Sequence, residues 1–389
     1  SAYLRAKEDY LMGINFSRLL SLKYGNAISN YLGTRYTVIS VGRVMTCVLG
    51  MVVRREREIR AFVKTPFYRV VSSIALEGES FEGEWRAVEG SRYFQSPVLY
   101  KENGFKKKED AQKLICELST QQPLICTVEK IERKKENKNP PLLFNLAELQ
   151  NVCSKLFKIS PDETLSIVQD LYEKKLVTYP RTDARVLSTA VAKEIYKNIS
   201  GLRNYPQAGE AAQGALELGA YKNIAKTRYT NDKQITDHYA IIPTGQGLGA
   251  LKGLSLTAQR VYETIVRRFL SIFYPPAVYQ KVSLVTKMEN ESFFSSFKVL
   301  LSEGYLKIAA NSFAKKSMAE ASGKTPESEG EGEVSCDEAL LAALQKLKKG
   351  DILNINGLGI KEGETSPPKR YNSGSMILAM ENAGQLIED

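Results

Sequence analysis

The hydrophobic pattern of the first part of the chain changes from helical to extended. Apolar residues recur at helical spacing over residues 2–32, with Gly33 as a stop signal, and a second helix is predicted over about residues 42–60. Residues 67–88 and 124–131 show short alternating runs instead, which predict a β-hairpin and a further strand. The chain is therefore expected to open with helices and to continue as sheet.

The next part of the chain is helical. Residues 132–141 are polar and end in two prolines, which predicts a connection and a domain boundary. Helical spacing then returns, and the predicted helices are residues 146–157, 162–171, 184–199 and 257–273. Because alternating patterns resume only at residues 278–287 and 293–301, the helical block is predicted to interrupt one β domain.

The last part of the chain mixes elements. Residues 317–335 are rich in Glu, Gly and Ser and poor in apolar residues, which is typical of a solvated loop. Residues 352–362 and 373–384 predict short strands followed by a helix. Neither end of the sequence carries the pattern of a domain boundary, so we expect it to be part of a longer protein.

The composition narrows the class of protein. Hydrophobic residues make up 43% and charged residues 25% of the 389, which excludes wholesale disorder, and no apolar run approaches the ~18 residues of a membrane span. With 54 Lys and Arg against 44 Asp and Glu, the net charge of +10 favours a polyanionic partner, nucleic acid first. The five cysteines form no CxxC pair, which argues against a zinc ribbon or a disulfide framework and suits a reducing cytoplasm.

The single histidine, His238, limits the possible chemistry. Ser-His-Asp catalysis would have to use it, and zinc sites or nucleases that need several imidazoles are excluded. We therefore expect any chemistry to rest on Tyr, Arg, Lys and carboxylate groups.

The most informative segment is Leu171-Tyr-Glu-Lys-Lys-Leu-Val-Thr-Tyr-Pro-Arg-Thr-Asp183. A helix is predicted to end at Lys174-Lys175, and the chain then extends through Thr178, Tyr179 and Pro180. Pro180 disfavours the helical conformation at Tyr179 and so presents the phenol on an extended loop beside Arg181. A phenol with a pKa of ~10 is a poor nucleophile, but a neighbouring guanidinium stabilises the phenolate and can hold a phosphate. The segment therefore suggests attack of a tyrosine on a phosphodiester. The alternative is that Tyr179 is a half-buried anchor of the loop.

Three further segments carry groups suited to phosphate. Thr236-Asp-His-Tyr-Ala-Ile-Ile-Pro-Thr244 sets the histidine beside Asp237, an acid that could orient it. Asn15-Phe-Ser-Arg18 and Ser40-Val-Gly-Arg-Val-Met-Thr46 each place a hydroxyl and an arginine near a helix N-terminal region, which favours phosphate binding. Each segment is a weak signal alone.

Taken together and in this order, these segments resemble those of the type IA DNA topoisomerases, most closely the bacterial topoisomerase III branch. Further matching pieces are Ser40-Val-Gly-Arg-Val44, Arg55-Glu-Arg-Glu-Ile59, Pro141-Leu-Leu-Phe-Asn-Leu-Ala-Glu-Leu-Gln150, Arg267-Arg-Phe269 and Thr365-Ser-Pro-Pro-Lys-Arg-Tyr371. The matches span nearly the whole chain, and the tyrosine motif is highly specific.

The resemblance implies roles for the matched residues. Tyr179 corresponds to the tyrosine that attacks single-stranded DNA and becomes joined to the 5′-phosphate, Arg181 would hold the scissile phosphate, and His238 would bind or help to cleave it. The match implies DNA binding by Arg18, Ser40, Arg43, Thr178, Thr182, Asp183, Asp237 and Arg370. Such contacts would be largely independent of base sequence and sensitive to salt.

The resemblance also exposes a difference. The family's N-terminal metal-binding (Toprim) domain, whose acids hold Mg²⁺, and its C-terminal Gly-Thr-x-Ala-Thr-Arg element have no counterpart in this sequence. The sequence contains no Asp-x-Asp, and the Glu-x-Glu at Glu77-Gly-Glu79 lacks the preceding Asp pair. We therefore expect no metal ligands in this chain, and DNA binding with little or no turnover.

The implied fold is multidomain α+β, a torus whose β-rich arch is interrupted by a helical gate domain that carries the nucleophile. The expected domains are residues 1–62 (helical base, first part), 63–138 (arch, first part), 139–275 (gate), 276–303 (arch, second part) and 304–389 (base, second part). The implied partners are single-stranded DNA and underwound or catenated duplex DNA. We expect a monomer in the bacterial cytoplasm.

Two alternatives use the same residue types. A tyrosine recombinase also combines Tyr with Arg, but its His-x-x-Arg precedes the tyrosine, whereas His238 follows Tyr179 here. A non-catalytic single-stranded DNA-binding module, in which Tyr179 stacks on bases, stays open. An assay for a covalent adduct separates it from an enzyme core.

Overall fold

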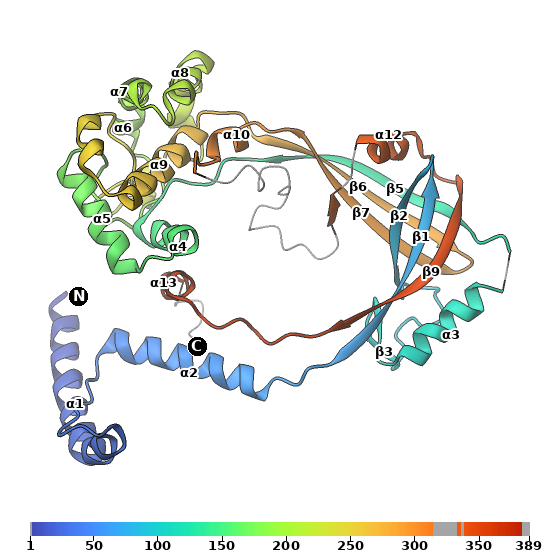
Figure 1. Cartoon of the computed structure of the whole chain (residues 1–389), viewed down its shortest axis with the longest axis horizontal. Coiled ribbons are helices and arrows are strands. Elements are labelled where there is room, and N and C mark those ends of the chain that lie inside the picture. The colour runs from blue at the N-terminus through green and yellow to red at the C-terminus, as the bar shows by residue number, and fades with distance from the viewer. Residues whose placement is uncertain (1, 121, 314–332, 336–337, 383–389) are drawn as a thin grey trace. The chain divides into compact units, whose positions relative to one another are not determined.

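The computed structural model describes residues 2–120, 122–313, 333–335 and 338–382. The chain divides into two units, which we call unit 1 (residues 1–63 and 366–389) and unit 2 (residues 64–365). Each unit contains segments from both halves of the sequence, as the colours of Figure 1 show.

Unit 1 is helical and consists of α1 (Ala2–Leu32), α2 (Arg43–Ala61) and α13 (Ser373–Glu381). The segment after α1 returns along that helix because two serines one turn apart hold it. Ser17 Oγ accepts the N–H of Val41 at 2.7 Å, and Ser21 Oγ accepts the N–H of Ile39 at 2.8 Å. Both long helices agree with the sequence prediction.

The C-terminal segment of unit 1 is bound to α2 by arginine. The Arg55 guanidinium donates to the Tyr371 hydroxyl at 3.0 Å and lies 4.2 Å from the centroid of that ring. Asn372 then begins α13 with a capping box, in which it and Ser375 each accept the other's backbone N–H. Two matched sequence segments, one near each end of the chain, thus meet in unit 1.

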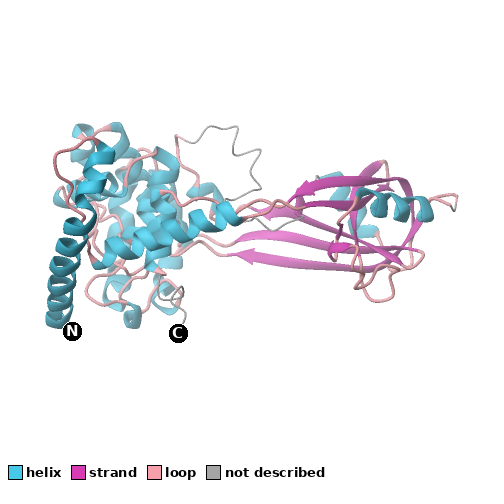
Figure 2. Ribbon diagram, turned by 90° about the horizontal axis from the view of Figure 1, so that it is seen from below, coloured by secondary structure: helices cyan, strands magenta, loops and turns pink. Residues whose placement is uncertain are grey.

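The strands of unit 2 form one nine-stranded sheet. They are β1 (Pro66–Leu76), β2 (Glu79–Arg86), β3 (Leu99–Lys101), β4 (Gly104–Phe105), β5 (Ile125–Lys138), β6 (Ala277–Met288), β7 (Glu291–Ser302), β8 (Glu333–Ser335) and β9 (Ile352–Glu364). Because β1 pairs with both β2 and β9, the strands close in the order β1-β2-β7-β6-β5-β9. Each of these six strands therefore has a partner strand on both sides over part of its length. Figure 2 shows the strands, in magenta, grouped together.

The hydrophobic core of the closed sheet follows from alternation along its strands. In β1, Val70 and Ile74 are completely buried, and in β2 Trp85 stacks on Phe105 with ring centroids 4.9 Å apart. Helices α3 (Lys108–Leu118) and α12 (Glu338–Lys346) contribute further buried residues, such as Leu114. The sequence pattern predicts neither helix.

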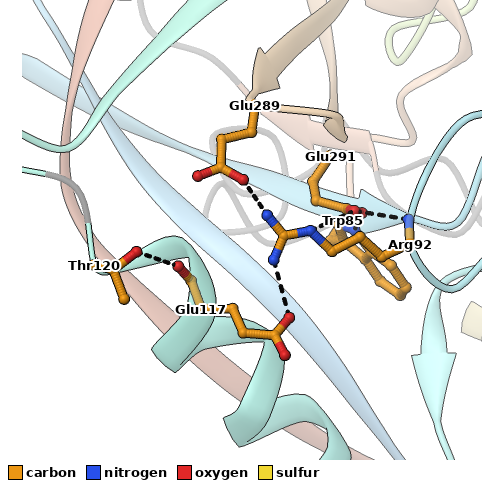
Figure 3. A network of polar contacts seen from close by, with 6 residues as sticks. All are labelled: Trp85, Arg92, Glu117, Thr120, Glu289 and Glu291. Carbon is orange, nitrogen blue, oxygen red and sulfur yellow. Dashed lines mark hydrogen bonds and ion pairs between the residues drawn. The ribbon is translucent and has the colours of Figure 1, made fainter.

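A polar network joins α3 to the sheet (Figure 3). The buried carboxylate of Glu291 accepts hydrogen bonds from Trp85 Nε1 at 2.7 Å and from the backbone N–H of Arg92 at 2.9 Å. The Arg92 guanidinium binds Glu117 of α3 at 3.0 Å and also pairs with Glu289; the hydrogen bond to Glu117 raises the pKa of Arg92. These donors offset the cost of burying a carboxylate, so the network fixes α3 against the β6–β7 turn.

The helical block of unit 2 lies in sequence between β5 and β6. Its helices are α4 (Leu146–Phe157), α5 (Pro161–Glu173), α6 (Thr189–Glu194), α7 (Tyr196–Gly201), α8 (Gly209–Leu218) and α9 (Leu256–Ser271), and α10 (Leu306–Ala309) follows β7. Phe144, Tyr262 and Phe269 are fully buried in its core. Because β5 and β6 pair along their length, these helices lie in sequence between two neighbouring strands of one sheet.

Strand β5 is longer than the sequence pattern predicts. Residues 132–138, expected as a connection and a domain boundary, continue the strand and pair with β6 as far as Lys138 opposite Ala277. Most of their side chains are exposed, so no hydrophobic alternation marks this part of the strand. Backbone pairing with β6, which a local pattern does not reveal, determines its extent.

Residues 184–199 do not form the single helix expected of them. Helix α6 begins only at Thr189, after Ser188 as N-cap, and α7 follows it as a separate short helix. The N–H of Leu187 bonds to the carbonyl of Tyr229 at 2.8 Å, which keeps the preceding residues extended. A tertiary contact therefore overrides the helical spacing.

The C-terminal part also differs from its expected assignment. Residues 352–364 form the single strand β9, between β5 and β1, rather than short strands of a second base segment. Residues 317–332 of the expected loop lie outside the described residues, whereas residues 333–335 form β8, parallel to β7. Long-range pairing with β1 places β9 in unit 2, and only the residues after it return to unit 1.

Candidate active site

The loop that carries Tyr179 begins at a tight turn after α5. The N–H of Lys175 bonds to the carbonyl of Tyr172 at 2.8 Å and that of Leu176 to Leu171 at 2.9 Å, with Lys175 in the left-handed conformation at φ 62°. Glycine is favoured at such a position, and an L-residue there costs roughly 1–2 kcal/mol. The chain then runs without regular structure through Tyr179, as the sequence predicts.

Two threonines join this loop to the segment that contains the histidine. Thr178 Oγ1 donates to the carbonyl of Ala240 at 3.0 Å and accepts the N–H of Ile242 at 3.0 Å. Thr182 Oγ1 donates to the carbonyl of His238 at 2.8 Å. Both hydroxyls, expected from the sequence to contact DNA, are therefore used in holding the two segments together.

Tyr179 is half-buried among aromatic rings. The centroid of the His238 ring lies 4.4 Å from that of Tyr179, and the Tyr172 ring meets Tyr179 edge to face at 5.5 Å. All three rings line a hollow of about 440 Å³, together with Lys175 and Thr244 among others. None of the described residues lining it is acidic, so the hollow suits an anionic ligand.

Arg181 lies two residues from Tyr179 and is exposed. Its guanidinium makes no hydrogen bond or ion pair with any residue in the described ranges, so its donors are available to a phosphate. Asp183 and Asp237 are exposed as well. Within the described part of the chain, Asp237 makes no hydrogen bond to the His238 ring, so the orienting contact considered from the sequence is not formed.

The other expected DNA-binding residues lie in unit 1. Arg18 and Ser40 are exposed there, and Arg43 begins α2 with a side chain outside the described part. Arg370 is bound by Glu56, with Nε to Oε1 at 2.5 Å and a second hydrogen bond at 3.1 Å. This bond lowers the pKa of Glu56. The guanidinium of Arg370 is therefore already paired, unlike that of Arg181.

The resemblance to the family implies a magnesium ion, but the described residues contain no group of side chains suited to bind it. Among the described residues, no three His, Cys, Asp or Glu side chains are grouped so that they could hold a metal ion. The described residues therefore do not fit Mg²⁺, and the steps proposed below involve this chain's own side chains. In the same part of the chain, no helix combines the length and apolar character of a membrane span.

Comparison with known proteins identifies the family. A family model described as DNA topoisomerase matches residues 1–385 of the 389. The chain belongs to the type IA DNA topoisomerase family. The resemblance seen in the sequence motifs is thus confirmed across the whole chain.

Relatives of this topoisomerase family are longer than the chain. DNA topoisomerase 3 of Bacillus licheniformis and that of Bacillus subtilis are each 31% identical to it over 389 residues, and that of Shouchella clausii is 30% identical. Each match covers 100% of this chain and 46% of the relative, so the chain spans about half the length of these topoisomerases.

A solved topoisomerase has a similar fold. The structure of full-length topoisomerase I from Thermotoga maritima gives a TM-score of 0.57 at 23% identity, over 95% of this chain and 52% of that one. The likeness agrees with the mixed helix and sheet expected for the family.

Sequence reasoning missed part of the hollow beside Tyr179. Tyr172, Lys175, Thr244 and Gln246 all line it. Thr244 Oγ1 bonds to the carbonyl of Lys175 at 2.5 Å, which ties the two segments across the hollow. The sequence did contain one signal for Lys175. It is a lysine at the end of a predicted helix, in a position where glycine is favoured.

Proposed function

We propose that this chain is the DNA-binding and strand-cleaving part of a type IA topoisomerase, with Tyr179 as the nucleophile. The observation that carries the proposal is the exposed guanidinium of Arg181, which has no partner among the described residues, two residues from the half-buried Tyr179, whose ring lies 4.4 Å from that of His238. A phenol with a histidine ring beside it and an arginine two residues further along the chain suits an anionic phosphodiester.

The proposed reaction exchanges one ester for another. The Tyr179 oxygen attacks the phosphorus of a single-stranded DNA phosphodiester, and the phenol loses its proton. An O–P bond forms to the 5′-phosphate while the P–O3′ bond breaks, and the released 3′-oxygen takes up a proton. Arg181 holds the scissile phosphate and stabilises the charge that develops on it, and His238 contributes to phosphate binding. The reverse attack by the 3′-hydroxyl reseals the strand after another strand has passed.

The resemblance to the family also suggests how the rest of the chain handles DNA. We propose that the sheet and the helical block of unit 2 act as the arch and gate of a ring, with single-stranded DNA at the gate and underwound or catenated duplex as the wider substrate. Arg18, Ser40 and Arg43 of unit 1 would guide the strand. Because such contacts go to phosphates, binding would weaken as salt rises.

A second candidate function is binding without cleavage. The rings of Tyr172, Tyr179 and His238 lie together at one hollow, and aromatic clusters bind single strands by stacking on bases. In that case the chain alone would hold DNA without forming a covalent bond.

The test is a search for the covalent adduct. Purified chain is incubated with single-stranded DNA labelled at its 3′ end, with and without Mg²⁺, and trapped with detergent. Because the tyrosine becomes joined to the 5′-phosphate, the fragment that carries the 3′ label stays attached to the protein. A label at the 5′ end would instead be released on a shortened strand. Tyr179→Phe should abolish the adduct, and Tyr196→Phe, which alters another exposed tyrosine on α7, should not.

Each outcome has a distinct meaning. A Tyr179-dependent adduct supports cleavage by this chain. Binding without an adduct favours the non-catalytic candidate for the chain alone. Absence of single-stranded DNA binding contradicts both.

A further inference from the structure

We infer that Lys175 and Tyr172 form a subsite for the nucleotide next to the attacked phosphate, with the lysine binding its phosphate and the tyrosine stacking on its base. The inference rests on the proposed function of Tyr179. It assigns DNA contact to two residues for which the sequence analysis predicts no role.

The position of Lys175 is the first observation. It lines the same hollow as Tyr179 and is exposed. Its ammonium forms no ion pair with any described carboxylate, whereas the adjacent Lys174 pairs with Asp170. A free cation in a hollow without acidic lining residues attracts a phosphate.

The position of Tyr172 is the second observation. It occupies the last turn of α5, and its side chain remains 42% exposed while its ring meets Tyr179 edge to face at 5.5 Å. A large aromatic surface left open beside the nucleophile can stack on a base of any sequence. The neighbouring Gln246, also in the lining, supplies an amide that could pair with a base edge.

The turn that carries Lys175 is held rigidly. The backbone carbonyl of Lys175 accepts a hydrogen bond from the hydroxyl of Thr244 at 2.5 Å. Gly247, at φ 71°, passes so close to the carbonyl of Lys174 that a Cβ would lie 2.5 Å from that oxygen. The ammonium is thus presented from a fixed backbone, which lowers the entropy cost of binding.

The backbone geometry also provides a clean variant. Because Lys175 lies at φ 62°, where glycine is favoured, Lys175→Gly removes the cation without straining the turn. The chain offers a matched control in Lys158, an exposed lysine at φ 59° at the end of α4 that does not line the hollow. The left-handed backbone is common to both lysines, so only the position beside Tyr179 distinguishes them.

The experiment measures binding of a fluorescein-labelled oligo-dT to the full chain by anisotropy over a range of salt. Wild type should bind with a salt-dependent affinity. Lys175→Gly should make the slope of log K against log salt shallower by about 0.7, the value for one phosphate contact on a single strand, and Lys158→Gly should leave it unchanged. Tyr172→Ala should weaken binding about 5- to 150-fold, while Tyr172→Phe and the control Tyr196→Ala should not. Thermal unfolding checks that every variant is folded.

The outcomes separate the two proposals. If wild type binds and Lys175→Gly behaves like Lys158→Gly, or folded Tyr172→Ala binds like wild type, the subsite is refuted and the role of Tyr179 stands. If wild type does not bind the oligonucleotide, the proposed function fails and the subsite fails with it.

Discussion

The side-chain hydroxyl of Thr182 donates a hydrogen bond at 2.8 Å to the backbone carbonyl of His238, 56 residues later in the sequence. The side chain of Thr182 is buried, and its oxygen also accepts the N–H of Ala184 at 3.1 Å. Together with Thr178 and Thr244, this side chain therefore holds the histidine segment to the tyrosine loop.

Removing that hydroxyl should loosen the site. Thr182→Val keeps the shape of the side chain but leaves a buried N–H and a carbonyl without their partner, so we expect a loss of roughly 1–3 kcal/mol in the free energy of unfolding. Urea denaturation measures it. Thr182→Ser retains the hydroxyl and is the control; equal stability of the two variants would contradict the role given to this bond.

Glu263 of α9 should be among the costliest residues to remove. Its buried carboxylate accepts hydrogen bonds from Arg267 Nε, from the backbone N–H of Ser312 and from the Ser312 hydroxyl, each at 2.6 Å. Glu263→Ala leaves Arg267, only 12% exposed, without its carboxylate, and should cost about 3–5 kcal/mol.

The control for Glu263 is an exposed ion pair. Glu194 bonds to Lys197 at 2.9 Å, with both side chains at least 60% exposed. Glu194→Ala should change the free energy of unfolding by no more than about 0.5 kcal/mol. Similar losses for the two variants in chemical denaturation would show that burial does not set the cost.

Thiol labelling should distinguish the two hydrophobic cores from the surface. Burial raises the pKa of Cys126 to about 11 and that of Cys153 to about 12, whereas Cys47 and Cys116 are exposed. At pH 8 we expect the exposed pair to react with iodoacetamide quickly and the buried pair only after local opening.

The labelling is best read by mass spectrometry in a Cys336→Ser background, because that residue lies outside the described ranges. Labelling of Cys153 as fast as that of Cys47 would argue against the packing of the helical core.

The pairing of Glu56 with Arg370 should depend on pH. The hydrogen bond from Arg370, the largest cause, lowers the pKa of Glu56 below its ordinary value of 4.5. A lowered pKa means that the contribution of the pair to stability is complete above that ordinary value and is lost as the pH falls through the lowered one. Arg370→Gln should bring the Glu56 pKa back toward 4.5, as an NMR titration would show. An unchanged pKa in that variant would contradict the pairing.

The sequence by itself determined the local elements and the family. Strong helical spacing predicted α1, α2, α4, α5 and α9, because periodicity acts within a few residues. The motif around Tyr179 likewise indicated the type IA topoisomerase family, since it lies in one continuous segment.

Only the tertiary structure decided the rest. The polar end of β5 and the placement of β9 depend on backbone pairing with distant strands, which leaves no local pattern. The contact of His238 with Tyr179 depends on hydrogen bonds that cross 56 to 69 residues, such as those of Thr182 and Thr244. Short-range propensity determines where a helix begins and ends, but long-range packing determines which side chains surround the tyrosine.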